Sequence, residues 1–309
     1  MSKSDFERRN RAPIFLNCLS RGGSNILWNL FLSHPGACSP IRETLEIFRI
    51  DRRRPTLTGL KFALLSAQPT FFDQWRLTPR PELNVRAARY MDRVLYREKM
   101  RTVSDAEMCF KNPTERYRED EVARARLVAK NNNGLLFLTE TLRQIYPEAT
   151  FFGLVREPLA LYESHRRRRL HGSPQAFADF YVTLVGKMVE DAERATDCHL
   201  VRFEDVLSEP VSVFHRVCEA AGLETSGIEQ LRFKSKEHFL PDGSRGADWA
   251  VGRHHWFELD AVGRFFEPKI NDLQADRLDP SEAAVILERT EELRRKLGYG
   301  AQADDADGK

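Results

Sequence analysis

The chain has 309 residues, 41% of them hydrophobic and 30% charged, an ordinary globular composition that suits one large α/β domain or two small ones. Because 48 basic residues balance 46 acidic ones, the net charge of +2 argues for neither nucleic acid nor a membrane as partner, and any anion site must come from local clustering. The five cysteines are scattered without a Cys-x-x-Cys pair, which argues against a disulfide framework and a zinc site.

The first twelve residues, MSKSDFERRNRA, are polar and lack the apolar core of a signal peptide. No run of about 18 apolar residues occurs in the sequence, so we expect no membrane span. These two observations predict a cytoplasmic protein.

The chain then alternates between short apolar runs and helical patterns. Buried parallel strands are predicted at residues 14–19, 125–130, 150–155 and 198–203. A helix is predicted after each of them, at 24–33, at 134–146, from Pro158 and from Ser208. Two further helices are expected at 174–196 and 280–297. This alternation predicts an α/β fold with three layers, a P-loop-like α/β/α sandwich whose central sheet is parallel and binds ligands beyond the carboxyl ends of its strands.

Two segments are less regular. Residues 40–124 are rich in arginine and contain the break TPRPELN, which predicts a helical insertion that covers the site. Residues 232–268 contain many Gly, Arg, His and Trp with little periodicity, which predicts a long active-site loop rather than a packed element. We therefore expect a single domain over residues 1–300 and a disordered tail at 301–309.

The stretch SRGGSN, which follows the first predicted strand, has the composition of an anion-binding turn. Arg21 can make a forked contact to an anionic oxygen, and Gly22 and Gly23 let the backbone approach closely. Ser24 can cap the helix and donate to a phosphate oxygen, while Asn25 adds an amide at the positive helix N-terminus. The stretch therefore predicts an anion-binding loop, although the P-loop motif GxxxxGK[ST] is absent. The alternative interpretation is an ordinary turn with a helix cap.

A second basic motif, VREPLALYES, follows the third predicted strand. Arg156 ends this strand, and Ser164 lies eight residues later, about two turns into the next helix. Together the two residues can clamp a second phosphate held apart from the first. Taken alone, Arg156 is explained equally well as part of a structural salt bridge, and Ser164 as an ordinary serine on a helix surface.

In combination, the two motifs resemble the sulfotransferase family that uses 3'-phosphoadenosine 5'-phosphosulfate (PAPS). The family's 5'-phosphosulfate loop, [RK]-S-G-[TS]-[TS], reads here Arg21-Gly22-Gly23-Ser24-Asn25. Its VRDP motif with a later serine, the 3'-phosphate site, reads Val155-Arg156-Glu157-Pro158 and Ser164. The resemblance covers most of residues 13–223 and the terminal LGY at 297–299. Two departures are Gly22, where the family commonly has Ser, and Asn25, where it has Ser or Thr.

This resemblance implies in-line transfer of a sulfuryl group from PAPS to an acceptor hydroxyl of a sugar, a peptide tyrosine or a small molecule, without a metal. Arg21 is then expected at the bridging oxygen and Lys130 at the sulfuryl oxygens. Glu43, in a Glu-Thr pair like that of tyrosylprotein and some carbohydrate sulfotransferases, is expected to be the base. Glu46, one helical turn later, is the rival, whereas His34 matches the family's structural His-Pro turn.

The segment SRGADW, within the predicted loop, resembles a looser version of the family's RKG…GDW motif. This implies that Arg245 and Gly246 contact the 3'-phosphate, with an ordinary glycine-containing loop as the alternative.

Two other functions stay open. One is a nucleotide-dependent small-molecule kinase, which the missing GK[ST] and the lack of an evident magnesium-binding aspartate disfavour. The other is a sulfotransferase-like protein that binds a nucleotide without catalysis. The sequence predicts neither the acceptor nor the oligomeric state.

Overall fold

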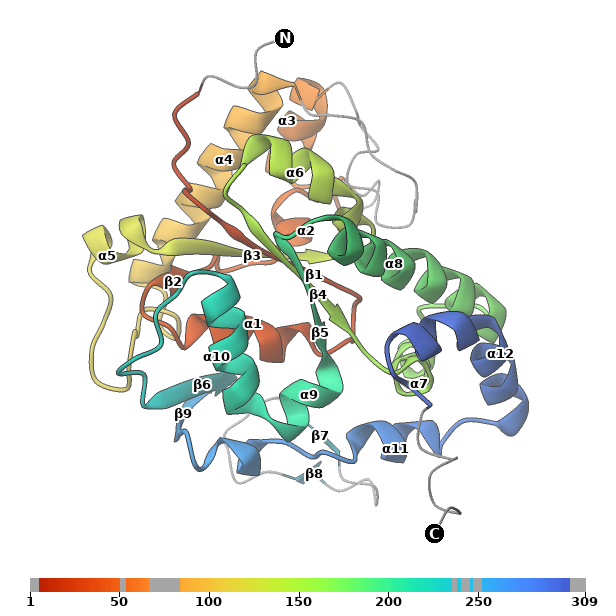
Figure 1. The fold of residues 1–309 in the computed structure, drawn as a ribbon. Helices are drawn as coiled ribbons and strands as arrows, with labels where there is room; N and C mark the ends of the chain where they lie inside the picture. Colours follow the sequence, from red (N-terminus) through yellow and green to blue (C-terminus); the bar gives the residue numbers. More distant parts are fainter. Residues whose placement is uncertain are drawn as a thin grey trace.

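Five parallel strands form the central sheet of the computed structural model, which describes residues 6–50, 54–66, 84–234, 238–239, 245–246 and 252–300. They lie in the order β2-β3-β1-β4-β5 (Figure 1). Their bounds are β1 Ile14–Cys18, β2 Ala37–Cys38, β3 Arg126–Asn132, β4 Thr150–Val155 and β5 Cys198–Arg202. The four strands expected from the sequence are present, and the edge strand β2 is an addition, because two residues are too few to carry a periodic pattern.

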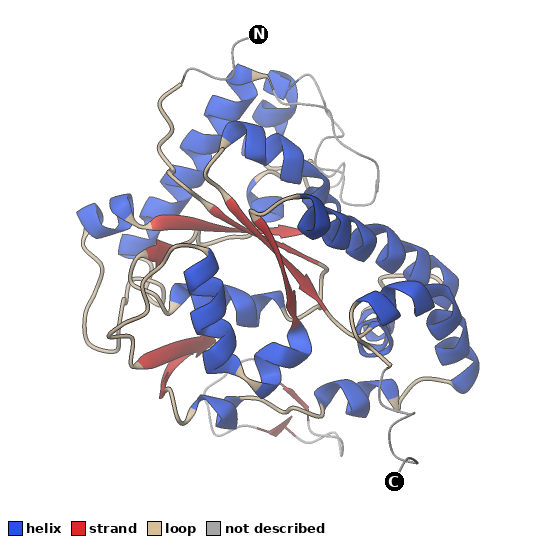
Figure 2. Cartoon of the chain, viewed as in Figure 1, coloured by secondary structure: helices blue, strands red, loops and turns tan. Residues whose placement is uncertain are grey.

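Helices cover both faces of this sheet (Figure 2), so the expected three-layer α/β/α fold is confirmed. The described α-helices are α1 Ser24–Leu32, α2 Thr44–Ile47, α3 Leu57–Ser66, α4 Val85–Met100, α5 Glu119–Arg124, α6 Thr139–Ile145, α7 Pro158–Arg167, α8 Pro174–Arg194, α9 Phe203–Ser208, α10 Pro210–Ala220, α11 Ile270–Ala275 and α12 Pro280–Lys296. One face packs against α1, α9 and α10, and the other against α2, α4 and α6. A third cluster joins α7, α8 and α12 beside β4.

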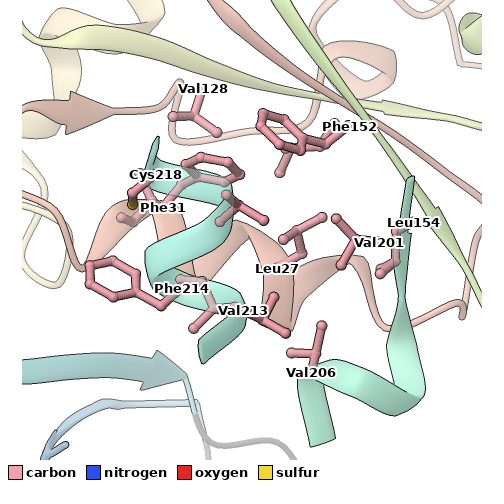
Figure 3. Packing of buried hydrophobic residues seen from close by; sticks show 14 of the residues in the cluster. Leu27, Phe31, Val128, Phe152, Leu154, Val201, Val206, Val213, Phe214 and Cys218 are labelled. Carbon is pink, nitrogen blue, oxygen red and sulfur yellow. The ribbon is translucent and has the colours of Figure 1, made fainter. Parts of the chain in front are cut away.

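The core follows the alternation of side chains along each strand. Ile14 and Leu16 of β1 point to the α1 side of the sheet, whereas Phe15 between them packs with α4 on the other side. Figure 3 shows Phe31 of α1 and Phe214 of α10 in this cluster, and the Phe31 ring lies against Phe152 of β4 with centroids 5.0 Å apart. Burying such a side chain stabilises the fold by about 1.5–3 kcal/mol, so these clusters hold the strand ends in register.

Two expectations differ in detail from the structure. The helix expected at 134–146 begins as a 3-10 turn, η2 Asn133–Leu138, and continues as α6. Within the predicted loop 232–268, part of the chain is regular: β6 Gln230–Lys234 pairs antiparallel with β9 His254–Glu258, and β7 His238–Phe239 pairs with β8 Arg245–Gly246. These strands are short and their partners distant in sequence, so the local pattern does not reveal them. The 3-10 turn η3 Val262–Phe265 follows.

None of the described helices combines the length and the apolar character that crossing a membrane requires.

The turn between β1 and α1, residues 20–25, is called here the glycine loop. Its backbone enters the left-handed region twice, at Arg21 with φ +68° and at Gly23 with φ +89°. A Cβ atom on Gly23 would lie 2.2 Å from the Phe203 ring, so only glycine fits there. Asn133, the first residue of η2 after β3, holds the loop: its Oδ1 accepts from Ser20 N at 2.9 Å, and its Nδ2 donates to Ser20 Oγ at 2.8 Å.

His165 of α7 holds the same loop from the other side. Its Nε2–H donates to the Ser20 carbonyl at 2.6 Å, and its ring stacks on His171 with centroids 5.1 Å apart. The side chain is 1% exposed, and its Nδ1 has no hydrogen-bond partner among the described residues. Burial lowers the pKa of His165 to about 4, with help from the positive charges of Arg21 and Arg156 and against the effect of the Ser20 bond.

We expect Gly23→Ala to lose about 2–5 kcal/mol of unfolding free energy, because a left-handed backbone costs about 1–2 kcal/mol for alanine and the Cβ overpacks the Phe203 ring. Gly186 is the control: it lies inside α8, and a Cβ there meets only Leu293 at 3.9 Å. Gly186→Ala should gain about 0.5–1 kcal/mol. Urea unfolding measures both, and equal stabilities of the two variants would contradict this account of the loop.

We also expect acid to weaken the fold through His165. Its pKa is about 4 in the folded protein and about 6.5 in the unfolded chain, so the unfolded chain binds more protons between these values. The unfolding free energy therefore falls as the pH falls from about 6.5 to about 4. His165→Asn keeps an N–H donor but does not titrate. Its unfolding free energy should therefore decrease less over this pH range, by up to about 3 kcal/mol. Urea unfolding at several pH values tests this, and identical pH slopes would argue against it.

Candidate active site

A cavity of about 420 Å³ lies at the carboxyl ends of the parallel strands. The glycine loop follows β1, Lys130 and Asn132 stand at the end of β3, Arg156 follows β4 and Phe203 follows β5, and all of these contribute to the lining. Of the loop, only Gly22 is outside the lining; its N–H bonds to the Leu19 carbonyl at 3.0 Å. The loops that leave neighbouring parallel strands converge at one edge, which explains why these distant segments meet here.

The ammonium group of Lys130 is the centre of a polar cluster in this cavity. It lies 2.5 Å from Glu43 Oε1, 2.5 Å from Asn25 Oδ1 and 5.0 Å from the centroid of a Trp28 ring. Asn132 Nδ2 donates to the other carboxylate oxygen of Glu43. The sequence singled out Glu43, Lys130 and Asn25 separately. The structure brings the three together and adds Asn132. Its position at the end of a predicted strand is the signal that could have marked it as a site residue.

The orientation of the Asn132 amide follows from a buried thiol. Cys18 Sγ lies 2.9 Å from Asn132 Oδ1. Burial raises the pKa of Cys18 to about 12, so the thiol is protonated near neutral pH and donates to this oxygen. The amide must then turn its Nδ2 toward Glu43.

Of the three side chains weighed as a base, Glu43 alone lines the cavity. Glu46 turns back and accepts from the Glu43 backbone N–H at 3.2 Å, as in a capping box at the start of α2. His34 uses both ring nitrogens in the turn after α1: Nδ1 accepts from Gly36 N at 2.9 Å, and Nε2 donates to the Glu224 carbonyl at 2.7 Å.

The two basic motifs of the sequence meet at Arg21. Its carbonyl accepts from Arg156 Nη1 at 3.1 Å, and its Nε donates to Ser164 Oγ at 3.2 Å. Ser164 is 3% exposed. Its hydroxyl oxygen accepts the bond from Arg21, so the hydroxyl hydrogen can still be donated to another acceptor. Burial is the main cause that lowers the pKa of Arg21, followed by the charges of Arg168 and Arg167. The site therefore concentrates positive charge beside the glycine loop.

Arg156 is held by a helix that the sequence did not connect with it. Asn271 Oδ1 accepts from Arg156 Nε at 2.9 Å and from Nη2 at 2.7 Å, and Gln274 Oε1 accepts from Nη2 at 2.6 Å. The guanidinium also lies 4.4 Å from the centroid of the Phe203 ring. Two amides one turn apart on α11 are typical of a solvated helix face, so no local signal could have marked them.

Apolar side chains complete the cavity lining beside these charges. Phe203, Leu207, Phe265, Phe266 and Ile270 line it. The ring of Phe265 stacks against Phe233, another lining residue, with centroids 5.1 Å apart. This lining suits a flat ring, because aromatic faces stack on one another.

Arg245 and Gly246 pair with Phe239 and His238 along the backbone of β7 and β8. Their side-chain surroundings lie outside what the structure describes, as does the rest of the SRGADW segment.

Comparisons with known proteins agree with this fold. A family model described as the sulfotransferase family matches residues 13–227, whereas a comparison with curated proteins finds no match. The sulfotransferase domain of the Synechococcus PCC 7002 olefin synthase has 17% identity and a TM-score of 0.53, and the alignment covers 96% of this chain and 98% of that one. The sulfotransferase domain from the curacin biosynthetic pathway has 14% identity and a TM-score of 0.49, with coverage of 91% and 99%.

The first of these structures shares the fold. The family model spans well over half of the chain, which includes the glycine loop and Arg156. The chain therefore belongs to the sulfotransferase family, and the PAPS-dependent sulfotransferase that its motifs implied is confirmed.

Proposed function

We propose that this sulfotransferase transfers the sulfuryl group of PAPS to an acceptor hydroxyl, with Glu43 as the base. The observation that carries the proposal is the cluster of Glu43, Lys130 and Asn25 inside the cavity that the glycine loop lines. A carboxylate, a buried ammonium and a loop with N–H donors at a helix N-terminus are the groups that such a transfer requires.

The residues of the cavity fit a nucleotide with two anionic groups. The glycine loop and the N-terminus of α1, together with Lys130, suit the 5'-phosphosulfate. Arg156, which lines the cavity, and Ser164, which lies outside the lining, both bond to Arg21 and suit the 3'-phosphate, held apart from the 5'-phosphosulfate. The aromatic lining around Phe203 suits the adenine ring.

The roles of the side chains follow from their contacts. PAPS supplies the sulfuryl group when it is bound. Glu43, oriented by Asn132, accepts the proton of the acceptor hydroxyl, so that the oxygen becomes a better nucleophile. Lys130 and Arg21 stabilise the negative charge that grows on the oxygens around sulfur and on the bridging oxygen.

We propose Glu43 rather than Glu46 as the base, because Glu46 contacts the backbone of its own helix start and does not line the cavity. Arg245 and Gly246 stay proposed contacts of the 3'-phosphate on the resemblance of their motif alone. The acceptor belongs to the class of sugars, peptide tyrosines or small-molecule hydroxyls, and residues 1–300 form the single domain that we propose to bind it.

Calorimetric titration without magnesium tests the donor site. 3'-phosphoadenosine 5'-phosphate (PAP) should bind more tightly than adenosine 5'-phosphate (AMP) or ATP. Arg156→Ala should weaken PAP by about 10- to 100-fold, because hydrogen bonds to charged groups contribute about 1.5–3 kcal/mol, and Ser164→Ala by about 3- to 10-fold. Arg124→Ala, which removes an exposed arginine paired with Asp120, is the control and should leave binding unchanged. Binding of ATP that requires magnesium would instead favour a kinase.

The base is tested by Glu43→Gln, which removes the proton acceptor with little change in shape. We expect kcat to fall by about 10²- to 10⁴-fold, while the affinity for PAP changes by less than about 3-fold. Glu46→Gln is the matched control, because glutamine also completes a capping box, and it should keep its activity. Transfer from labelled PAPS to a panel of phenols, sugars and tyrosine peptides gives the readout. An active Glu43→Gln enzyme would rule out this assignment.

A further inference from the structure

Arg156 is a buried cation whose direct side-chain hydrogen bonds go to neutral groups. Its side chain is 5% exposed, and four hydrogen bonds connect it with Asn271, Gln274 and the Arg21 carbonyl. Within the described part of the chain, no salt bridge joins it to a carboxylate. These contacts use four of the five N–H groups of a guanidinium, and the fifth is on Nη1, the nitrogen that bonds the glycine loop.

The nearest carboxylate in this network stands one residue away. Asn271 Nδ2 donates to Glu204 Oε1 at 2.5 Å, and the same carboxylate accepts from Glu157 N at 2.9 Å and from Tyr299 OH at 2.8 Å. Burial lowers the pKa of Arg156 to about 10, and the charge of Glu204 opposes this shift. The guanidinium therefore keeps its positive charge at neutral pH, with the compensating charge separated from it by an amide.

We infer that Asn271 and Gln274 are positioning residues for the donor site: their neutral amide oxygens fix the Arg156 guanidinium against the glycine loop and leave its charge available to the 3'-phosphate. The inference rests on the proposed function, in which Arg156 binds that group. A carboxylate at the same place would hold the guanidinium equally well. It would also cancel much of the field that attracts an anion, because two opposite charges in contact act at a distance as a dipole.

In the alternative arrangement, the two amides block Arg156 until the nucleotide displaces them. The hydrogen bonds that hold Asn271 in place argue against this alternative. Its amide is bonded on both sides, to Arg156 and to Glu204, and Glu204 is itself held by two further donors. A swing of Asn271 would leave a half-buried carboxylate and a buried guanidinium with unmade hydrogen bonds.

This support comes from outside the segment that the family model matches. The match ends at residue 227, whereas α11 spans Ile270–Ala275 and packs against α7, the helix that follows Arg156 and carries Ser164 (Figure 1). The chain thus uses its C-terminal part to set the geometry of a residue that the family segment supplies.

Gln274→Glu is the sharpest test, because Gln274 accepts a hydrogen bond from Arg156 and the change adds one charge at nearly constant shape. Calorimetry of the full chain should give an affinity for PAP about tenfold lower, with the affinity for AMP changed by less than about twofold, so that the preference for PAP over AMP falls about tenfold. Gln274→Ala, which removes one of the four bonds, should lower the preference by about threefold. Thermal unfolding should show that both variants fold.

Gln144→Glu is the charge control, because this exposed residue lies in α6, in the layer on the other face of the sheet. The preference of this variant for PAP over AMP should equal that of the unchanged protein. An unchanged or increased preference in Gln274→Glu would overturn the inference, and tighter PAP binding in Gln274→Ala would establish the blocking arrangement in its place. If the unchanged protein itself bound PAP no more tightly than AMP, the proposed 3'-phosphate site would fail first and the inference with it.

Discussion

The burial of two cations, Lys130 and Arg156, at one edge of the sheet is the constraint on which the rest of the site depends. An isolated charge inside a protein costs several kcal/mol unless it is paired and hydrogen-bonded. The chain meets this requirement in two ways. Lys130 contacts a carboxylate directly, whereas Arg156 contacts amides and has its carboxylate one residue further away. The first arrangement places a carboxylate beside a cation, and the second leaves a buried cation with no carboxylate bonded to it among the described residues.

The conformation of the glycine loop likewise depends on hydrogen bonds from neighbouring segments. Its left-handed residues would not hold their conformation unaided, because the backbone of Arg21 is strained there. Asn133 on one side and His165 on the other bond to Ser20, and Arg156 bonds to the next carbonyl. The loop is thereby fixed by residues of η2, of α7 and of the turn between β4 and α7. A loop held from three sides presents its N–H groups without reorganisation, which is what an electrostatic site requires.

Membership of the sulfotransferase family and the geometry of the cavity answer different questions. The family gives the class of reaction. The geometry separates Glu43 from Glu46 through the direction of two side chains, and it connects Arg156 with α11, beyond the matched segment. Aromatic residues from 203 to 266 then complete a cavity to which residues 20 to 156 contribute most of the polar lining.

The sequence by itself determined the elements that local pattern controls. Apolar runs of six residues followed by helical periodicity predicted β1, β3, β4 and β5, and the spacing of Arg156 and Ser164 predicted their place at a strand end and on the next helix. Contacts between segments were decided by the tertiary structure alone. The Cys18–Asn132–Glu43 chain joins three segments across 114 residues, and Asn271 reaches Arg156 across 115. The β6–β9 pair lies within a segment expected to be a loop. Periodicity reports which face of one element is buried, but it does not report what that face meets, because a partner distant in sequence leaves no trace in the local pattern.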